Sequence, residues 1–149
     1  MPISIVLFAI GFNSINSWLN AEWIFSLHHP YTYEWLYSPQ FIIGVMLFIT
    51  GMGINIKTDD MLFALRENGE VDYKIPHGHM FKWVSCPNYF GEILEWIGWA
   101  LATWSLAGLS FAVWAIANLV PRALANHKWY QEKFSDYPRS RKALIPKIW

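Results

Sequence analysis

The fold is decided by the stretch Asn88-Tyr89-Phe90-Gly91-Glu92-Ile93-Leu94-Glu95-Trp96, which places two carboxylates and an amide at the start of a long apolar run. On a helix, Asn88, Glu92 and Glu95 fall at positions i, i+4 and i+7 and form one polar stripe. Residues 97–121 carry no charge, so the stripe lies where water gives way to hydrocarbon. A charged side chain at that depth costs about 2.5–3.5 kcal/mol unless it is paired. The stripe therefore predicts partners for these groups, among them a bound polar cofactor.

Uncharged stretches of similar length recur along the chain, at residues 1–21, 35–56 and 97–121. Each is close to the roughly 20 residues that a helix needs to cross a bilayer. A soluble helix bundle would need charged side chains on the outward face of each helix, and these stretches have none. The 149-residue sequence therefore predicts an all-α fold, a polytopic membrane helix bundle that acts as one domain.

The basic residues give the number of spans and their orientation. All eleven Lys and Arg lie within residues 57–82 or 122–147. Positively charged loops favour the cytoplasmic side, so an even number of crossings must separate these two segments. The sequence thus predicts four transmembrane helices, at about residues 1–26, 37–56, 87–104 and 108–126, with a connection near Ser105 to Gly108. The loop of residues 57–82 and the C-terminal tail are both predicted to be cytoplasmic, at the endoplasmic reticulum in a eukaryote or the inner membrane in a bacterium.

Several polar or small residues inside the predicted spans have two interpretations. Asn13, Asn16 and Asn20 form a narrow stripe on the first span that serves either hydrogen bonding between helices or contact with a ligand. Gly51 and Gly53 allow the close approach of either a second helix or a ligand. The basic and aromatic tail after Arg122 suits either anionic lipid headgroups or the phosphates of a nucleotide. The alternating residues 71–75 resemble a short strand.

The sequence lacks the short motifs of soluble nucleotide-binding and metal-dependent enzymes. It contains no Gly-x-Gly-x-x-Gly, no Walker loop, no His-Glu-x-x-His and no Cys-x-x-Cys. The pair His28-His29 has no third ligand at metal spacing, so we expect no metal site. The single Cys86 excludes an internal disulfide, and the net charge of zero gives no indication of nucleic acid. A polar cofactor that enters from the cytoplasm and an apolar substrate that arrives from the lipid fit this arrangement.

Long, ordered motifs resemble the steroid 5α-reductases, the 3-oxo-5α-steroid 4-dehydrogenases, along essentially the whole chain. The motifs are Gly51-Met52-Gly53-Ile54-Asn55-Ile56, Asp59, Arg66, Tyr73-Lys74-Ile75-Pro76, residues 88–105 and residues 136–146. The resemblance implies a multi-span membrane enzyme that uses NADPH to reduce the C4–C5 double bond of a 3-oxo-Δ4 steroid. Its partners are then the steroid or a related lipid and the surrounding membrane lipid.

The resemblance also implies a set of cofactor-binding residues. The adenosine and phosphate end of NADPH is assigned to Asn55, Asp59, Arg66, Tyr73 and Lys74. The nicotinamide end is assigned to Asn88 and Glu92, with Glu92 accepting a hydrogen bond from the carboxamide. The last helix closes the site with Arg122, His127 and Tyr130.

The chain also departs from the family pattern. The family has a histidine at the position of Lys57, an arginine at the position of Phe63, and a histidine pair where this chain has Asn126-His127. The resemblance covers the last four of the family's seven spans. The residues that polarise the steroid carbonyl in the family therefore have no counterpart here, and the catalytic residues stay unassigned. We expect either a shortened copy that is inactive alone or a partner chain that supplies the missing helices.

Alternative functions remain at this point. The first is reduction of a trans-2-enoyl thioester in fatty-acid elongation, and the second is isoprenylcysteine-type methyl transfer from S-adenosylmethionine. The interval from Asp59 to Arg66 and the motif Tyr73-Lys74-Ile75-Pro76 favour the steroid reductase over both. The third alternative is a non-catalytic membrane fragment whose polar stripes serve packing alone.

Overall fold

The computed structural model describes residues 2–27, 31–65 and 73–148. Its helices are α1 (Ile3–Glu22), the π-helical turn η1 (Trp23–Leu27), the short 3₁₀ helix η2 (Tyr33–Tyr37), α2 (Pro39–Ala64), the 3₁₀ turn η3 (His79–Lys82), α3 (Pro87–Thr103) and α4 (Leu106–Lys133). The predicted all-α class is confirmed, since these described residues contain helices and no strand. Of the predicted short strand, Val71 and Asp72 lie outside the described residues, and Tyr73 to Ile75 has no regular structure.

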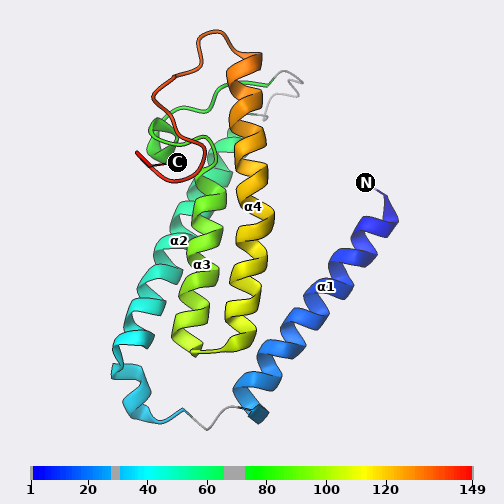
Figure 1. Cartoon of the computed structure of the whole chain (residues 1–149), viewed down its shortest axis with the longest axis vertical. Coiled ribbons are helices and arrows are strands. Elements are labelled where there is room, and N and C mark those ends of the chain that lie inside the picture. The colour runs from blue at the N-terminus through cyan, green and yellow to red at the C-terminus, as the bar shows by residue number, and fades with distance from the viewer. Residues whose placement is uncertain (1, 28–30, 66–72, 149) are drawn as a thin grey trace.

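Three helical segments are long and apolar enough to cross a membrane, namely Ile3–Leu27, Pro39–Ala64 and Leu106–Lys133. The shorter α3 lies between α2 and α4 in the bundle (Figure 1). A fourth crossing by α3 therefore stays a prediction. Two helices run beyond the predicted spans, because α2 continues past Ile56 to Ala64 and α4 continues past Asn126 to Lys133. These extensions carry Asp59, His127 and Tyr130, which the sequence analysis placed in the candidate site.

Facing glycines bring α2 and α3 into backbone contact. A Cβ added at Gly91 would lie 2.6 Å from the carbonyl oxygen of Gly51, and one at Gly98 would lie 2.6 Å from that of Gly44. The glycines recur every seven residues on both helices, so the contact runs along one antiparallel seam. Of the two alternatives for Gly51, helix packing is the one that the structure shows. Nothing lies within 4 Å of a Cβ added at Gly53.

Capping side chains and loop aromatics fix the helix ends. The Ser38 hydroxyl accepts a hydrogen bond from the Phe41 amide, and the Ser105 hydroxyl accepts one from the Gly108 amide at 2.9 Å. The turn between α3 and α4 lies at Trp104, whose φ is 44°, and at Ser105. Tyr31 and Trp35 donate to the carbonyl oxygens of Thr103 and Ala102, which lie at the C-terminal end of α3. The aromatic loop thus satisfies carbonyls that the helix leaves without internal partners.

The first helix leans away from the other three (Figure 1). Its contacts with them include a hydrogen bond from the Trp99 indole nitrogen to the Asn20 side-chain oxygen at 2.7 Å, and Phe12 packing on Phe111 and Trp114. Asn20 also bonds Asn16, whereas Asn13 bonds the carbonyl of Ala9 in its own helix. Part of the asparagine stripe therefore serves helix packing, as one of the two interpretations proposed.

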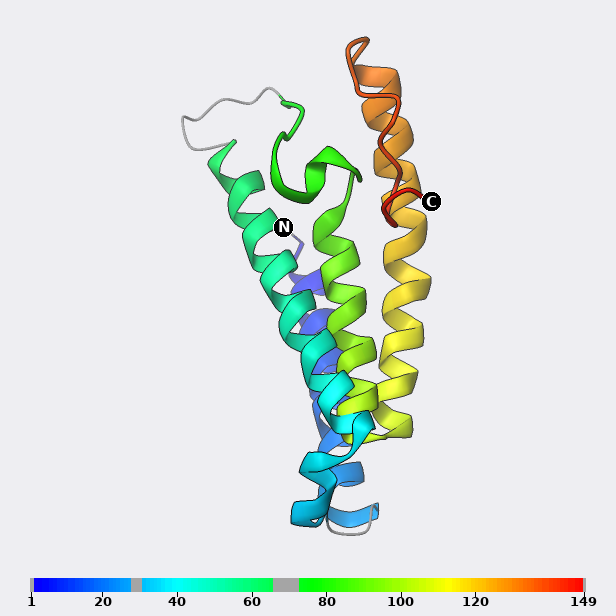
Figure 2. The same cartoon turned by 90° about the vertical axis from the view of Figure 1, so that its left-hand side faces the viewer.

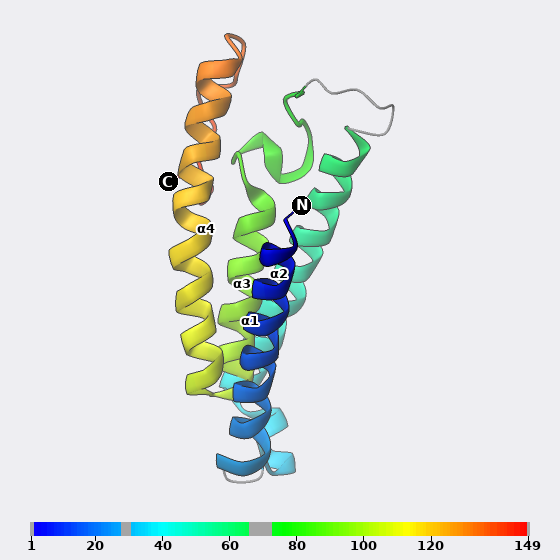
Figure 3. The ribbon, with the colours of Figure 1, turned by 90° about the vertical axis from the view of Figure 1, so that its right-hand side faces the viewer.

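The C-terminal tail turns back at the end of α4 and runs beside that helix (Figures 2 and 3), where it pairs with the loop that precedes α3. Val84 and Lys142 form a parallel bridge, in which the Ser85 amide donates to the Lys142 carbonyl at 2.9 Å and the Lys142 amide donates to the Trp83 carbonyl at 2.9 Å. Ala143 and Leu144 are buried against Cys86, Ile93 and Leu119. The tail is thus part of the protein core at this end of the bundle.

Candidate functional site

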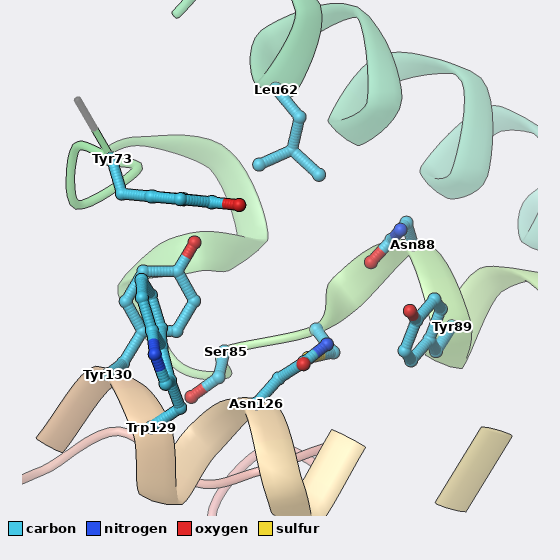
Figure 4. A pocket seen from close by; sticks show the side chains of 9 residues that line it. Leu62, Tyr73, Ser85, Asn88, Tyr89, Asn126, Trp129 and Tyr130 are labelled. Atoms are coloured by element: carbon cyan, nitrogen blue, oxygen red, sulfur yellow. The ribbon is translucent and has the colours of Figure 1, made fainter. Parts of the chain in front are cut away.

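A pocket of about 460 Å³ lies at the end of the bundle where the charged loop and the tail meet. Its lining comes from the C-terminal end of α2, the loop before α3, the first turn of α3 and the last part of α4 (Figure 4). The lining residues are Leu62, Tyr73, Ser85, Cys86, Asn88, Tyr89, Asn126, Trp129 and Tyr130. Its volume is in the range of small-molecule and cofactor sites.

A hydrogen-bonded network across the α2–α3 seam holds Asn88 at one wall of this pocket. The Asn55 side-chain nitrogen donates to the Asn88 carbonyl oxygen at 3.1 Å, and the Asn88 side-chain nitrogen donates to a carboxylate oxygen of Asp59 at 3.1 Å. With its nitrogen committed to Asp59, the Asn88 amide presents its oxygen toward the pocket (Figure 4). The structure thus joins three of the residues that the sequence analysis assigned to the cofactor.

Glu92 lies one turn further along α3 and is partly buried. Asp59 and Arg122 are close enough to interact with its carboxylate electrostatically, and Glu92 in turn interacts with Glu95. The polar stripe of α3 therefore faces charged groups from both neighbouring helices. Glu92 adjoins the network of Asn55, Asp59 and Asn88 without lining the pocket.

Aromatic rings border the opposite side of the pocket. Tyr73 meets Trp129 edge to face with ring centroids 5.0 Å apart, and Trp129 meets Tyr130 in the same way at 5.1 Å. Tyr130 also stacks on Tyr137 with centroids 5.3 Å apart. Such rings offer flat apolar faces on which a planar ligand ring can stack. Tyr73 and Tyr130 were assigned to the site from the sequence.

His127 is turned toward the loop before α3 and the tail. Its Nδ1 contacts the Ser85 hydroxyl, and its Nε2 lies 2.9 Å from the side-chain nitrogen of Gln131. The Ser85 hydroxyl also contacts the Tyr137 hydroxyl at 2.7 Å. Among the described residues of α4, those that line the pocket are Asn126, Trp129 and Tyr130.

The remaining assigned residues lie outside the pocket lining. Lys74 and Arg122 are exposed, and Arg66 lies outside the described residues. The sequence analysis did not assign Leu62, Ser85, Cys86, Tyr89, Asn126 and Trp129, which the structure adds to the lining. A signal for Asn126 was present in the sequence, since it is a polar residue in the predicted last span where the family has a histidine.

The comparisons with known proteins agree with one another. The sequence model of the family described as 3-oxo-5-alpha-steroid 4-dehydrogenase matches residues 1–149. The chain is 47% identical over 149 residues to the protein named steroid 5-alpha-reductase DET2 of Gossypium hirsutum. The matched region covers 99% of this chain and 58% of that protein. It is 46% identical over 146 residues to 3-oxo-5-alpha-steroid 4-dehydrogenase 1 of Bos taurus, covering 98% of this chain and 56% of that protein.

A human relative extends the same pattern. The chain is 44% identical over 146 residues to 3-oxo-5-alpha-steroid 4-dehydrogenase 1 of Homo sapiens, covering 98% of this chain and 56% of that protein. The chain thus spans a little over half the length of the relatives that it matches. The resemblance found in the sequence motifs is confirmed, and the chain belongs to the steroid 5α-reductase family.

Proposed function

We propose that this chain binds NADPH and takes part in the reduction of the C4–C5 double bond of 3-oxo-Δ4 steroids. The observation that carries the proposal is the pocket in which the amide oxygen of Asn88 faces the rings of Tyr73 and Tyr130. When bound, NADPH supplies the hydride for such a reduction, while the protein orients the reacting groups. Family membership supports the reaction class, since the relatives are named as a steroid 5-alpha-reductase and as 3-oxo-5-alpha-steroid 4-dehydrogenases.

The chemistry of the pocket suits a dinucleotide. The side-chain oxygen of Asn88 offers an acceptor for a carboxamide N–H. Asp59 orients this amide by accepting a hydrogen bond from its nitrogen, and Asn55 donates to the Asn88 backbone carbonyl. Tyr73, Trp129 and Tyr130 provide faces for a nicotinamide or adenine ring. In this proposal Lys74, Arg122 and Arg66 supply positive charge for the phosphates, because guanidinium and ammonium groups form strong charge-assisted hydrogen bonds with them.

The location of the basic residues at the pocket end of the bundle indicates how the protein is oriented in the membrane. The loop after α2 and the tail after α4 lie at this end (Figure 1), and with the adjoining ends of α2 and α4 they carry the basic residues. We infer that this end faces the cytoplasm, from which NADPH enters, and that the steroid enters from the lipid. The membrane is that of the endoplasmic reticulum in a eukaryote or the inner membrane in a bacterium.

Because the matched relatives are longer, the complete steroid site is proposed to include helices beyond these 149 residues, from the same or another chain. The exposed polar face of α1, formed by Asn13, Ser14 and Ser17, supplies hydrogen-bonding groups for such helices.

A ligand panel tests the cofactor assignment. NADPH is expected to raise the melting temperature of the detergent-solubilised chain, because a ligand that binds the folded state stabilises it by mass action. NADH and S-adenosylmethionine serve as matched controls and are expected to have little effect. Protection by S-adenosylmethionine would support methyl transfer, and protection by no member of the panel would support the non-catalytic alternative.

Glu92 adjoins the Asn88 network behind the pocket lining, and we propose that its carboxylate also accepts a hydrogen bond from the nicotinamide carboxamide at that edge of the pocket. Glu92→Ala is therefore expected to weaken NADPH binding by about tenfold, since a charge-assisted hydrogen bond contributes about 1.5–3 kcal/mol. The measurement is NADPH affinity, followed by energy transfer to NADPH from the protein's tryptophans, which include Trp129 in the pocket lining. Glu95→Ala is the matched control, because Glu95 is an equally apolar-flanked glutamate on the same helix. Equal losses for both variants, or loss of the folded state in Glu92→Ala alone, would contradict a direct role for Glu92.

A further inference from the structure

Ser85 joins three segments that are distant in the sequence. Its hydroxyl oxygen contacts Nδ1 of His127 on α4, lies 2.7 Å from the Tyr137 hydroxyl of the tail, and lies 3.2 Å from the Lys142 carbonyl oxygen. Ser85 and Tyr137 are 4% and 5% exposed, so the contacts are shielded from water. We call Ser85, His127 and Tyr137 the junction. Ser85 also lines the pocket, so the junction forms the rear of one pocket wall.

One arrangement of protons satisfies every contact of the junction. Ser85 donates its single proton to the Lys142 carbonyl oxygen and accepts from the Tyr137 hydroxyl and from Nδ1–H of His127. The Nε2 of His127 then accepts a proton from the Gln131 amide at 2.9 Å. Both ring nitrogens of His127 are thereby used by protein groups, and neither is left for a ligand.

The neighbouring Asn126 has the opposite arrangement. It lines the pocket, and its side-chain nitrogen points to Cys86 Sγ at 3.8 Å, which leaves its amide oxygen available. Successive residues of a helix point about 100° apart, and at this turn Asn126 faces the pocket while the His127 ring turns toward Ser85 and Gln131. The pocket wall seen in Figure 4 accordingly contains Asn126 and Ser85 side by side.

We propose that His127 is a positioning residue that acts through Nδ1 on Ser85, and that Asn126 is the residue of this helical turn that contacts the pocket ligand. Together with Tyr137, His127 holds the pocket wall formed by Ser85 and Cys86 against α4. The C-terminal tail, which carries Tyr137, thus helps to position the pocket lining. The inference rests on the proposed function only in that the ligand is taken to be NADPH. The contacts of the junction do not depend on it.

Two substitutions of His127 separate positioning from direct contact. An asparagine amide reaches the place of Nδ1, and a glutamine amide reaches the place of Nε2. His127→Asn is therefore expected to keep NADPH affinity within about threefold, whereas His127→Gln loses about tenfold, the effect of one buried hydrogen bond. The reverse order, with glutamine tolerated and asparagine not, would show that Nε2 contacts the ligand and would overturn the proposal.

The single cysteine gives a readout that needs no NADPH. Cys86 is 4% exposed, its amide donates to the Ala143 carbonyl, and burial raises the pKa of its thiol to about 11. Opening of the junction exposes this thiol, so Tyr137→Phe is expected to speed its reaction with a maleimide by about threefold to tenfold. Tyr33→Phe is the matched control, because Tyr33 is 88% exposed on η2 at the other end of the bundle.

The paired readouts keep the two proposals apart. If the wild-type chain does not bind NADPH while Tyr137→Phe and His127→Gln speed labelling of Cys86, the proposed function fails and the junction stands. If labelling of Cys86 is the same in wild type, His127→Gln and Tyr137→Phe, the junction does not hold the wall and the inference is overturned. Tyr137→Phe keeps its ring, with its stack on Tyr130, so this variant is expected to fold even where the histidine variants do not.

Discussion

Gly91→Ala is expected to destabilise the protein by about 1–3 kcal/mol or more, because it inserts a methyl group into a fully packed helix seam. The added Cβ would lie 2.6 Å from the carbonyl oxygen of Gly51 and 2.7 Å from the backbone nitrogen of Asn55. Both neighbours are backbone atoms, so no side-chain rotation relieves the clash. The helices must move apart, and the unfolding temperature in detergent measures the cost.

The same substitution is expected to weaken ligand binding, because the seam positions the polar network. Asn55 and Asp59 on α2 reach Asn88 on α3 through hydrogen bonds of 3.1 Å each. A shift of α2 by a few tenths of an ångström lengthens both bonds and releases the Asn88 amide. NADPH affinity measured below the unfolding temperature is thus expected to fall together with stability.

Gly53→Ala is the matched control for the seam. Gly53 is also a glycine of α2, yet a Cβ there would meet nothing within 4 Å. Alanine is about 1 kcal/mol more favourable than glycine in a helix, so this variant is expected to be as stable as the wild type or more so. Wild-type stability in Gly91→Ala would show that α2 and α3 do not approach as closely as described.

Much of the fold follows from local features of the sequence. Uncharged stretches of membrane-spanning length predicted the long helices, and Trp104-Ser105 forms the turn close to the expected connection. The extension of α2 to Ala64 was not predicted, because the charged residues after Ile56 signal the end of the membrane and not the end of a helix. The packing of the tail on Val84 was not predicted either, since one backbone bridge across the chain leaves no periodic pattern.

The candidate site could be predicted only in part, because a local sequence pattern does not show which residues face the pocket. Tyr73, Asn88 and Tyr130, which the family resemblance assigns to NADPH, line the pocket, and Asp59 supports Asn88. Their contact with NADPH stays a prediction. Between Asn126 and His127 the histidine is the more conspicuous side chain, yet the pocket contains Asn126. Which of two adjacent residues faces a pocket depends on the rotation of α4 against the loop before α3. At this turn α4 contacts α3, Ser85 and the tail, which are distant from it or from one another in the sequence, so a local pattern cannot reveal the rotation.

Asn88→Asp is expected to lower NADPH affinity by more than about tenfold, because like charges that are placed together cost several kcal/mol. In the wild type the side-chain nitrogen of Asn88 donates to the Asp59 carboxylate at 3.1 Å. The substitution replaces this donor with a second carboxylate, so the two side chains repel and the acceptor that faces the pocket turns away. The backbone bond from Asn55 to the carbonyl of residue 88 is retained, which confines the damage to the side chain.

The exchange of both residues is expected to restore binding. In the double variant Asn88→Asp with Asp59→Asn, the amide at position 59 donates to the carboxylate at position 88, whose second oxygen again faces the pocket. Asp59→Asn alone leaves two amides that still form a neutral hydrogen bond, so its loss is expected to be only about threefold. A double-mutant cycle on NADPH affinity therefore measures a coupling that favours the exchanged pair. Additive losses would show that Asp59 and Asn88 act on the ligand separately, and the hydrogen bond between them would then not be what orients the Asn88 amide.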